Sequence, residues 1–144
     1  MAGRVLGVDV GARRVGLAIS DTSRTLARPL STIEVTDAAE AIDRIVKTID
    51  ELVTDEDGLD TVVVGLPARL DGSATGATPR VQAFVDALRA RTPLRIVTED
   101  ERLTSREAES RLALNERDWR KRKQKLDAAA AAIILQDYLD RGSG

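Results

Sequence analysis

Six consecutive residues, Thr61 to Leu66, read Thr-Val-Val-Val-Gly-Leu and carry no charge. A strand with this composition is typical of parallel sheets, which helices cover on both faces. The segment before it begins at Asp37, a helix-capping residue, and its apolar residues from Ile42 to Val53 recur at helical spacing. A strand that follows such a helix returns parallel to an earlier strand. The sequence therefore predicts an α/β protein.

The first third of the chain predicts antiparallel strands. Residues 4–10 are rich in apolar and β-branched side chains, residues 11–14 carry turn signals, and residues 15–20 resemble a second strand, so the two form a hairpin. A third strand is expected over residues 26–35, where Pro29 favours an edge or irregular position because proline cannot donate a ladder hydrogen bond. We expect a mixed five-stranded sheet, with three antiparallel strands followed by parallel ones and flanked by helices.

The second half alternates helices and strands. A helix is expected from Thr78 to about Arg91, and the fifth strand over residues 94–98. A capping box predicts a further helix from Thr104, and the last helix is expected from about Leu126 to Leu139. Residues 67–79 are rich in glycine and lack periodicity, which indicates a substrate loop at the carboxyl end of the sheet.

The size and hydropathy of the chain indicate a soluble protein. Its 144 residues fit one domain, spanning residues 1–144. The longest apolar run, residues 128–135, is too short to cross a bilayer. The first nine residues lack the features of a secretory signal. We therefore expect a cytoplasmic protein that does not contact membranes.

The chain contains no cysteine and no histidine. This composition excludes disulfides, thiolate catalysis, Ser-His-Asp chemistry and a Cys/His zinc site. If the protein is an enzyme, its cofactor is expected to be a hard cation bound by oxygen ligands, Mg²⁺ or Mn²⁺. The net charge of −2 gives no global attraction to nucleic acid, so such binding requires a local basic patch.

Three acids are candidate metal ligands, although each also has a structural interpretation. Asp9 lies in an otherwise apolar strand, where a carboxylate is costly without a neutralising partner, but it could form a turn with Gly11. Glu101 belongs to an acidic cluster at a strand end, which is also typical of a solvated loop. Asp127 lies at the predicted start of the last helix, where it could interact with the helix dipole.

Taken together, these three acids predict a hydrolytic centre. In a sheet of this order, the first strand, the carboxyl end of a neighbouring strand and the start of the last helix can converge. Clustered carboxylates repel one another unless a cation lies among them. One or two Mg²⁺ ions held by Asp9, Glu101 and Asp127 could activate water for phosphodiester hydrolysis.

Basic residues near the last helix predict contacts with nucleic acid. They surround Trp119, the only tryptophan, and fit phosphate binding combined with base stacking. The tryptophan could instead fill the core between helices. The cluster comprises Arg117, Arg120, Lys121, Arg122, Lys123 and Lys125, and the further candidates are Arg13, Arg14 and Arg69.

Four motifs in this order resemble the YqgF/RuvX family over nearly the whole chain. They are residues 7–11 with 16–18, residues 64–67 with Asp71-Gly72, residues 100–104, and residues 125–127 leading into the alanine-rich helix. The resemblance implies a ribonuclease H-like fold and a nuclease that acts either on Holliday junctions or on precursor 16S ribosomal RNA.

The resemblance also bears on individual residues. The catalytic acids proposed for the family fall on Asp9, Glu101 and Asp127. Two features depart from the family pattern: Arg69 stands where relatives often carry asparagine, and residues 115–119 lack a glycine that relatives often have.

Two other interpretations remain open. Actin-like ATPases share the Gly-x-Asp-x-Gly hairpin, but they need a second domain for which 144 residues leave no room. A non-catalytic nucleic-acid or ribosome-assembly module would keep the fold without the activity. Resolution of a four-way junction needs two matched cuts and suggests a homodimer, although no apolar stripe in the sequence assigns its interface.

Overall fold

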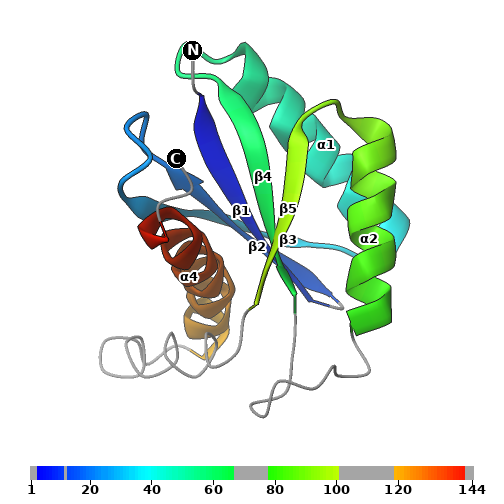
Figure 1. Ribbon diagram of the computed structural model, residues 1–144. Helices are drawn as coiled ribbons and strands as arrows, with labels where there is room; N and C mark the ends of the chain where they lie inside the picture. Colours follow the sequence, from blue (N-terminus) through cyan, green and yellow to red (C-terminus); the bar gives the residue numbers. More distant parts are fainter. Residues whose placement is uncertain (1–2, 12, 67–77, 101–118, 142–144) are drawn as a thin grey trace.

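The computed structural model describes residues 3–11, 13–66, 78–100 and 119–141 (Figure 1). For residues 66, 78, 80, 100 and 119–127 it describes the backbone alone. The strands are β1 (Arg4–Val10), β2 (Arg14–Ser20), β3 (Ala27–Glu34), β4 (Leu59–Leu66) and β5 (Arg95–Asp100), and the helices are α1 (Ala38–Thr54), α2 (Thr78–Arg91) and α4 (Trp119–Asp140).

The strands form a five-stranded sheet in the order β3-β2-β1-β4-β5. β1 pairs antiparallel with β2, and β2 with β3, whereas β4 is parallel to both β1 and β5. This arrangement confirms the predicted mixed sheet. The carboxyl ends of β1, β4 and β5 meet at one edge, the lower edge in Figure 1. We call this the carboxyl edge of the sheet.

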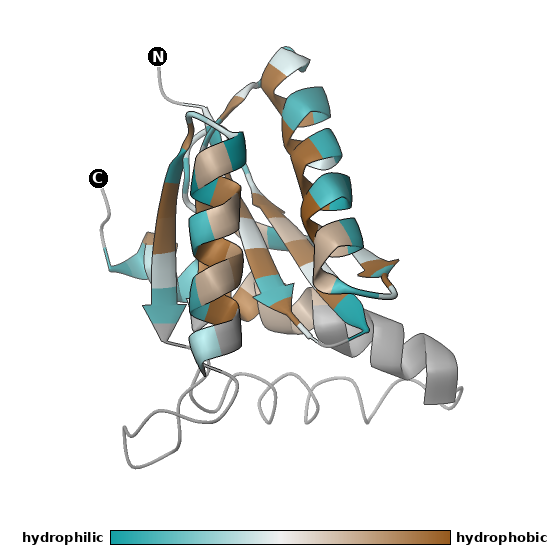
Figure 2. Ribbon diagram, turned by 90° about the vertical axis from the view of Figure 1, so that its right-hand side faces the viewer, coloured by the Kyte–Doolittle hydropathy of each residue, from teal (hydrophilic) through white to brown (hydrophobic). Residues whose placement is uncertain are grey.

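Helices cover both faces of the sheet. α1 and α2 lie on one face, and α4 crosses the other (Figure 1). Each face has its own apolar core: Leu6 and Val8 of β1 belong to the core under α1 and α2, whereas Val5 packs with Leu135 of α4. Apolar residues of α1 gather on the side that faces the rest of the molecule (Figure 2). Among the described residues, no helix combines the length and the apolar character needed to span a membrane.

The start of α1 follows the sequence prediction. The Asp37 carboxylate accepts a hydrogen bond from the Glu40 amide at 2.8 Å, and the Glu40 carboxylate accepts one from the Thr36 amide at 2.8 Å. These bonds satisfy amides that lack partners within the helix. The cap fixes the point at which the chain leaves β3 and enters α1.

Pro29 lies on an edge strand, as predicted. β3 pairs with β2 alone, and the register shifts where Leu17 pairs with Ser31 and Ala18 with Pro29. Leu30 is therefore an extra residue in a bulge. Because the proline ring carries no N–H, this irregular stretch tolerates proline where a central strand would not.

The predicted start of the last helix is wrong. α4 begins at Trp119 rather than at Leu126, so the basic residues 120–125 form its first turns and not a separating segment. Arginine, lysine and glutamine are good helix formers, and no glycine or proline interrupts residues 119–140. Asp127 consequently lies beyond the first turn, where the helix dipole has little effect. The helix predicted from Thr104 falls outside the described residues.

α4 approaches the sheet most closely at Gly7 of β1. A Cβ atom at this position would lie 2.9 Å from the Leu135 Cβ and 3.0 Å from the Ala131 carbonyl oxygen. Such separations are shorter than van der Waals contact, so only glycine allows the helix backbone to come this near.

Candidate active site

Asp9 lies at the carboxyl edge on the face covered by α4. Side chains alternate along a strand, so Asp9 shares its face with Val5 and Gly7, both of which meet α4. Its neighbours Val8 and Val10 point to the opposite face, under α1 and α2. The Asp9 side chain is half-buried. This position provides a carboxylate that is partly shielded from water and lies near the open end of a central strand.

A second acid, Glu99, lies in the same row of the sheet. Val8 pairs with Val64, so continuing this register by one residue places Asp9 beside Gly65, and Gly65 pairs with Glu99 on β5. Glu99 alternates with Val97, which packs in the α4 core, so both acids occupy that face. Gly65 has no side chain to separate them. Adjacent strands lie about 4.8 Å apart, which puts the two backbones roughly 10 Å from each other.

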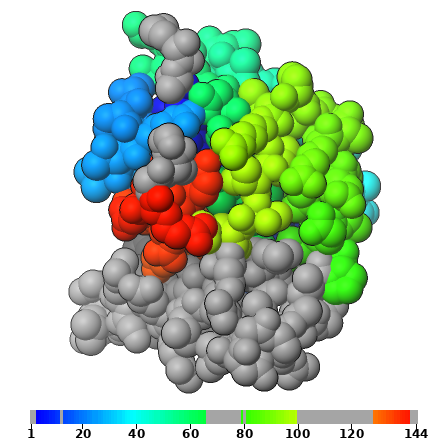
Figure 3. Space-filling model, in the orientation of Figure 1, coloured from blue at the N-terminus to red at the C-terminus, as the bar shows by residue number. Residues whose placement is uncertain are grey.

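The Glu99 carboxylate is neutralised by the C-terminal end of α4. The residue is only 4% exposed, and it forms an ion pair with Arg141. Figure 3 shows the red end of α4 against the yellow-green surface of β5. Burying a charge is unfavourable without such a partner, so this pair fixes the end of α4 to the strand that leads to Glu101.

Sequence reasoning missed Glu99. It ended the fifth strand at residue 98 and treated the acids after it as belonging to a strand end, whereas β5 continues to Asp100. The alternation of Val97 and Glu99 within a longer strand was the available signal. The pairing of Glu99 with Gly65, in contrast, is a tertiary feature that no local pattern contains.

Of the other two predicted acids, one lies outside the described residues and the other has only its backbone described. Glu101 lies outside the described residues. Asp127 is on α4, one helical turn before Ala131, whose carbonyl oxygen lies against Gly7. Asp9 follows Gly7 by two residues. Asp9 and Asp127 therefore each lie close, along their own element, to the same contact between β1 and α4.

The residues predicted to contact nucleic acid also differ in how far the structure describes them. Arg69 and Arg117 lie outside the described residues, while Trp119, Arg120, Lys121, Arg122, Lys123 and Lys125 are on α4, where only the backbone is described. Arg13 is exposed and Arg14 half-buried in the hairpin after Asp9. The Gly11 amide donates to the Arg14 carbonyl oxygen at 2.9 Å, and a Cβ on Gly11 would lie 2.7 Å from that oxygen. This tight turn holds both arginines at the carboxyl edge.

Three carboxylates would suit a hard divalent cation, which prefers oxygen ligands. Within the described ranges, no three acidic, histidine or cysteine side chains gather as a metal-binding group. Asp9 is the one proposed ligand whose side chain is described, and its half-buried position at the carboxyl edge is compatible with that role.

Comparison with known proteins identifies the family. The model of the RuvX family, described as Holliday junction resolvase, matches residues 3–141. The chain belongs to the RuvX family. A candidate pre-16S rRNA nuclease of Desulforudis audaxviator is 37% identical over 142 residues, which cover 98% of this chain and 97% of the relative. A second such RuvX relative, from Chloroflexus aggregans, is 43% identical and covers 94% of this chain and 92% of its own length.

A solved structure confirms the predicted ribonuclease H-like fold. RuvC of T. thermophilus, in complex with a Holliday junction substrate, superposes with a TM-score of 0.54 at 17% identity. The match covers 98% of this chain and 97% of the RuvC chain. At this identity the likeness shows the fold alone.

Proposed function

We propose that residues 1–144 form one nuclease domain that hydrolyses phosphodiester bonds in structured nucleic acid. Membership of the RuvX family over nearly the whole chain supports nuclease activity. The single observation that carries the site is the placement of Asp9, half-buried at the carboxyl edge of a central strand. We assign Asp9, Glu101 and Asp127 as the catalytic acids and Mg²⁺ or Mn²⁺ as the cofactor.

The proposed acids differ in how the chain positions them. β1 supplies Asp9 from a rigid element, the ion pair between Glu99 and Arg141 holds the strand that leads to Glu101, and α4 supplies Asp127. A bound divalent cation would stabilise the charge that develops on the phosphate and lower the pKa of the attacking water. Arg13 and Arg14 would orient the phosphate backbone beside Asp9.

The names of the relatives give two substrates for the test. The purified protein would be incubated with Mg²⁺ or Mn²⁺ and a labelled four-way DNA junction, linear duplex DNA or precursor 16S rRNA, with EDTA as the control. Paired symmetric nicks in the junction alone would identify a resolvase, and trimming of the RNA alone would identify an rRNA maturation nuclease. If metal leaves every substrate intact, the protein is a binding module and the proposal of catalysis is wrong.

The basic residues of α4 are expected to contribute to affinity through the phosphates. Each phosphate that a lysine or arginine neutralises adds about 0.7 to 0.9 to the slope of log affinity against log salt. The double variant Arg120→Gln, Lys121→Gln should lower the slope of log affinity against log salt by about 1 to 2 units.

Fluorescence anisotropy in EDTA would measure this slope without cleavage. The matched control is Lys47→Gln, Arg91→Gln, which removes the same charge from exposed sites on α1 and α2. Equal slopes for the two double variants would show that the start of α4 does not contact phosphates.

A further inference from the structure

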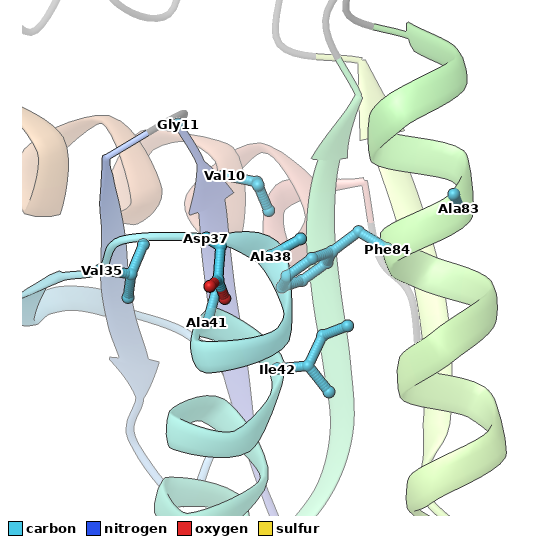
Figure 4. A pocket seen from close by; sticks show the side chains of 9 residues that line it. All are labelled: Val10, Gly11, Val35, Asp37, Ala38, Ala41, Ile42, Ala83 and Phe84. Atoms are coloured by element: carbon cyan, nitrogen blue, oxygen red, sulfur yellow. The ribbon is translucent and has the colours of Figure 1, made fainter.

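A cavity of about 380 Å³ opens at the carboxyl edge, on the face opposite Asp9. It lies between the end of β1 and the helices α1 and α2 (Figure 4). Val10, which contributes to its wall, directly follows Asp9 in the strand. The cavity and the proposed catalytic acid therefore lie on the two sides of the same strand end. The described lining residues are Val10, Gly11, Val35, Asp37, Ala38, Ala41, Ile42, Ala83 and Phe84.

The chemistry of the wall favours a flat apolar ring with hydrogen-bond donors. Phe84 extends from α2 toward the first turn of α1, and it is only 4% exposed, so its ring is a fixed part of the wall (Figure 4). Asp37 is the single charged side chain among the described lining residues. Its Oδ1 is occupied by the Glu40 amide, at 2.8 Å, as the cap of α1. A carboxylate at this place repels phosphate and attracts amino groups.

The backbone of a basic residue, Arg13, is hydrogen-bonded to the wall of this apolar cavity. The Val35 amide donates to the Arg13 carbonyl oxygen at 2.9 Å, so the hairpin that carries Arg13 is tied to the cavity wall. Gly11, in the same turn, lines the cavity itself. Arg13 is exposed and therefore accessible to a phosphate outside the cavity. The arrangement matches a nucleotide with its phosphate on the hairpin and its base inside.

We propose that this cavity, which we call the base pocket, binds one unstacked nucleobase of the strand that is cleaved. The inference rests on the proposed function, because it assigns a subsite to the same substrate. Flipped bases are held by apolar or aromatic walls and by hydrogen bonds to their polar edge. The Asp37 carboxylate can accept from the exocyclic amino group of cytosine or adenine, which thymine and uracil lack.

The first test uses NMR spectroscopy of the full chain in EDTA. Cytidine 5′-monophosphate is expected to shift the amide signals of Ala38, Ala41 and Ala83 in a saturable manner, whereas ribose 5-phosphate is not. Equal shifts with both compounds would show phosphate binding, and the base pocket would be refuted. An absence of shifts at these three amides with cytidine 5′-monophosphate would refute it as well.

The second test fills the base pocket. Ala83→Leu and Ala38→Leu each add a side chain at its wall, from α2 and α1 respectively. Each should weaken binding of a single-stranded cytosine-containing oligonucleotide by roughly 5- to 100-fold. The control is Ala90→Leu, the same change at an exposed position of α2 outside the described lining. Affinities of both filled variants equal to that of Ala90→Leu would overturn the proposal.

A competition experiment separates a strand from a free nucleotide. Cytidine 5′-monophosphate bound in the pocket should be displaced by the oligonucleotide. If a saturating oligonucleotide leaves it bound, the pocket takes free nucleotides and its assignment to the strand is wrong. All these measurements are independent of cleavage, so a protein that binds bases but cuts nothing would refute the nuclease proposal and not the pocket.

Discussion

Asp9→Asn is expected to abolish metal-dependent cleavage while the protein remains folded. The amide occupies the same volume as the carboxylate, but it carries no charge to hold a divalent cation. Loss of partners that merely orient metal ligands costs about 10- to 100-fold in activity or metal affinity, so loss of a ligand should lower the cleavage rate by at least about 100-fold. The rate would be measured on whichever substrate the wild-type protein cuts.

A matched control separates this effect from general loss of charge. Asp50→Asn makes the same change at an exposed position of α1, on the other side of the sheet, and should cleave at the wild-type rate. Thermal unfolding of both variants would verify that each remains folded. A folded Asp9→Asn protein with wild-type cleavage would remove Asp9 from the catalytic site.

Gly7→Val is expected to destabilise the protein by about 3 kcal/mol, near the upper end of the usual cost of overpacking a core. The added Cβ would lie 2.9 Å from the Leu135 side chain and 3.0 Å from the Ala131 carbonyl oxygen. A change of rotamer relieves neither contact, because the Leu135 Cβ is fixed by the helix backbone and the carbonyl belongs to it, so α4 must move away from β1. Urea denaturation would report the loss as a lower midpoint at an unchanged slope.

Two further variants test this explanation. Gly7→Ala should cost less than Gly7→Val because it adds fewer atoms. Leu135→Ala should rescue Gly7→Val only in part, because it removes the Leu135 Cδ2 atom, 3.5 Å away, whereas alanine keeps the Cβ and the Ala131 carbonyl contact remains. The coupling between the two positions would appear as non-additive unfolding free energies. A Gly7→Val protein as stable as the wild type would show that α4 does not approach the strand this closely.

The local elements of this fold could be predicted because their causes are local. Asp37 and Glu40 form a cap from residues that are three apart in sequence, and Pro29 marks an edge because of its own missing N–H. The mixed sheet followed from the order of such elements. The start of α4 was predicted wrongly because its charged residues were interpreted as a loop, although they are good helix formers.

The arrangement of the candidate site depends on contacts between distant segments. Asp9 and its placement on a strand were recognisable from the apolar residues around it. Glu99 was not, because its importance comes from the register that sets it beside Gly65 and from the ion pair with Arg141, more than 40 positions further along the chain. The base pocket likewise combines a strand end with two helices that are far apart in sequence.

The irregular edge of β3 has a consequence for self-association. An exposed edge strand offers free backbone donors and acceptors to which a second copy can add a strand, a common route to aggregation. Here Pro29 removes a donor, and the bulge at Leu30 breaks the regular spacing that an added strand needs. Sheet extension through β3 is therefore disfavoured, so a two-fold assembly is not expected to form by pairing the β3 strands of two copies.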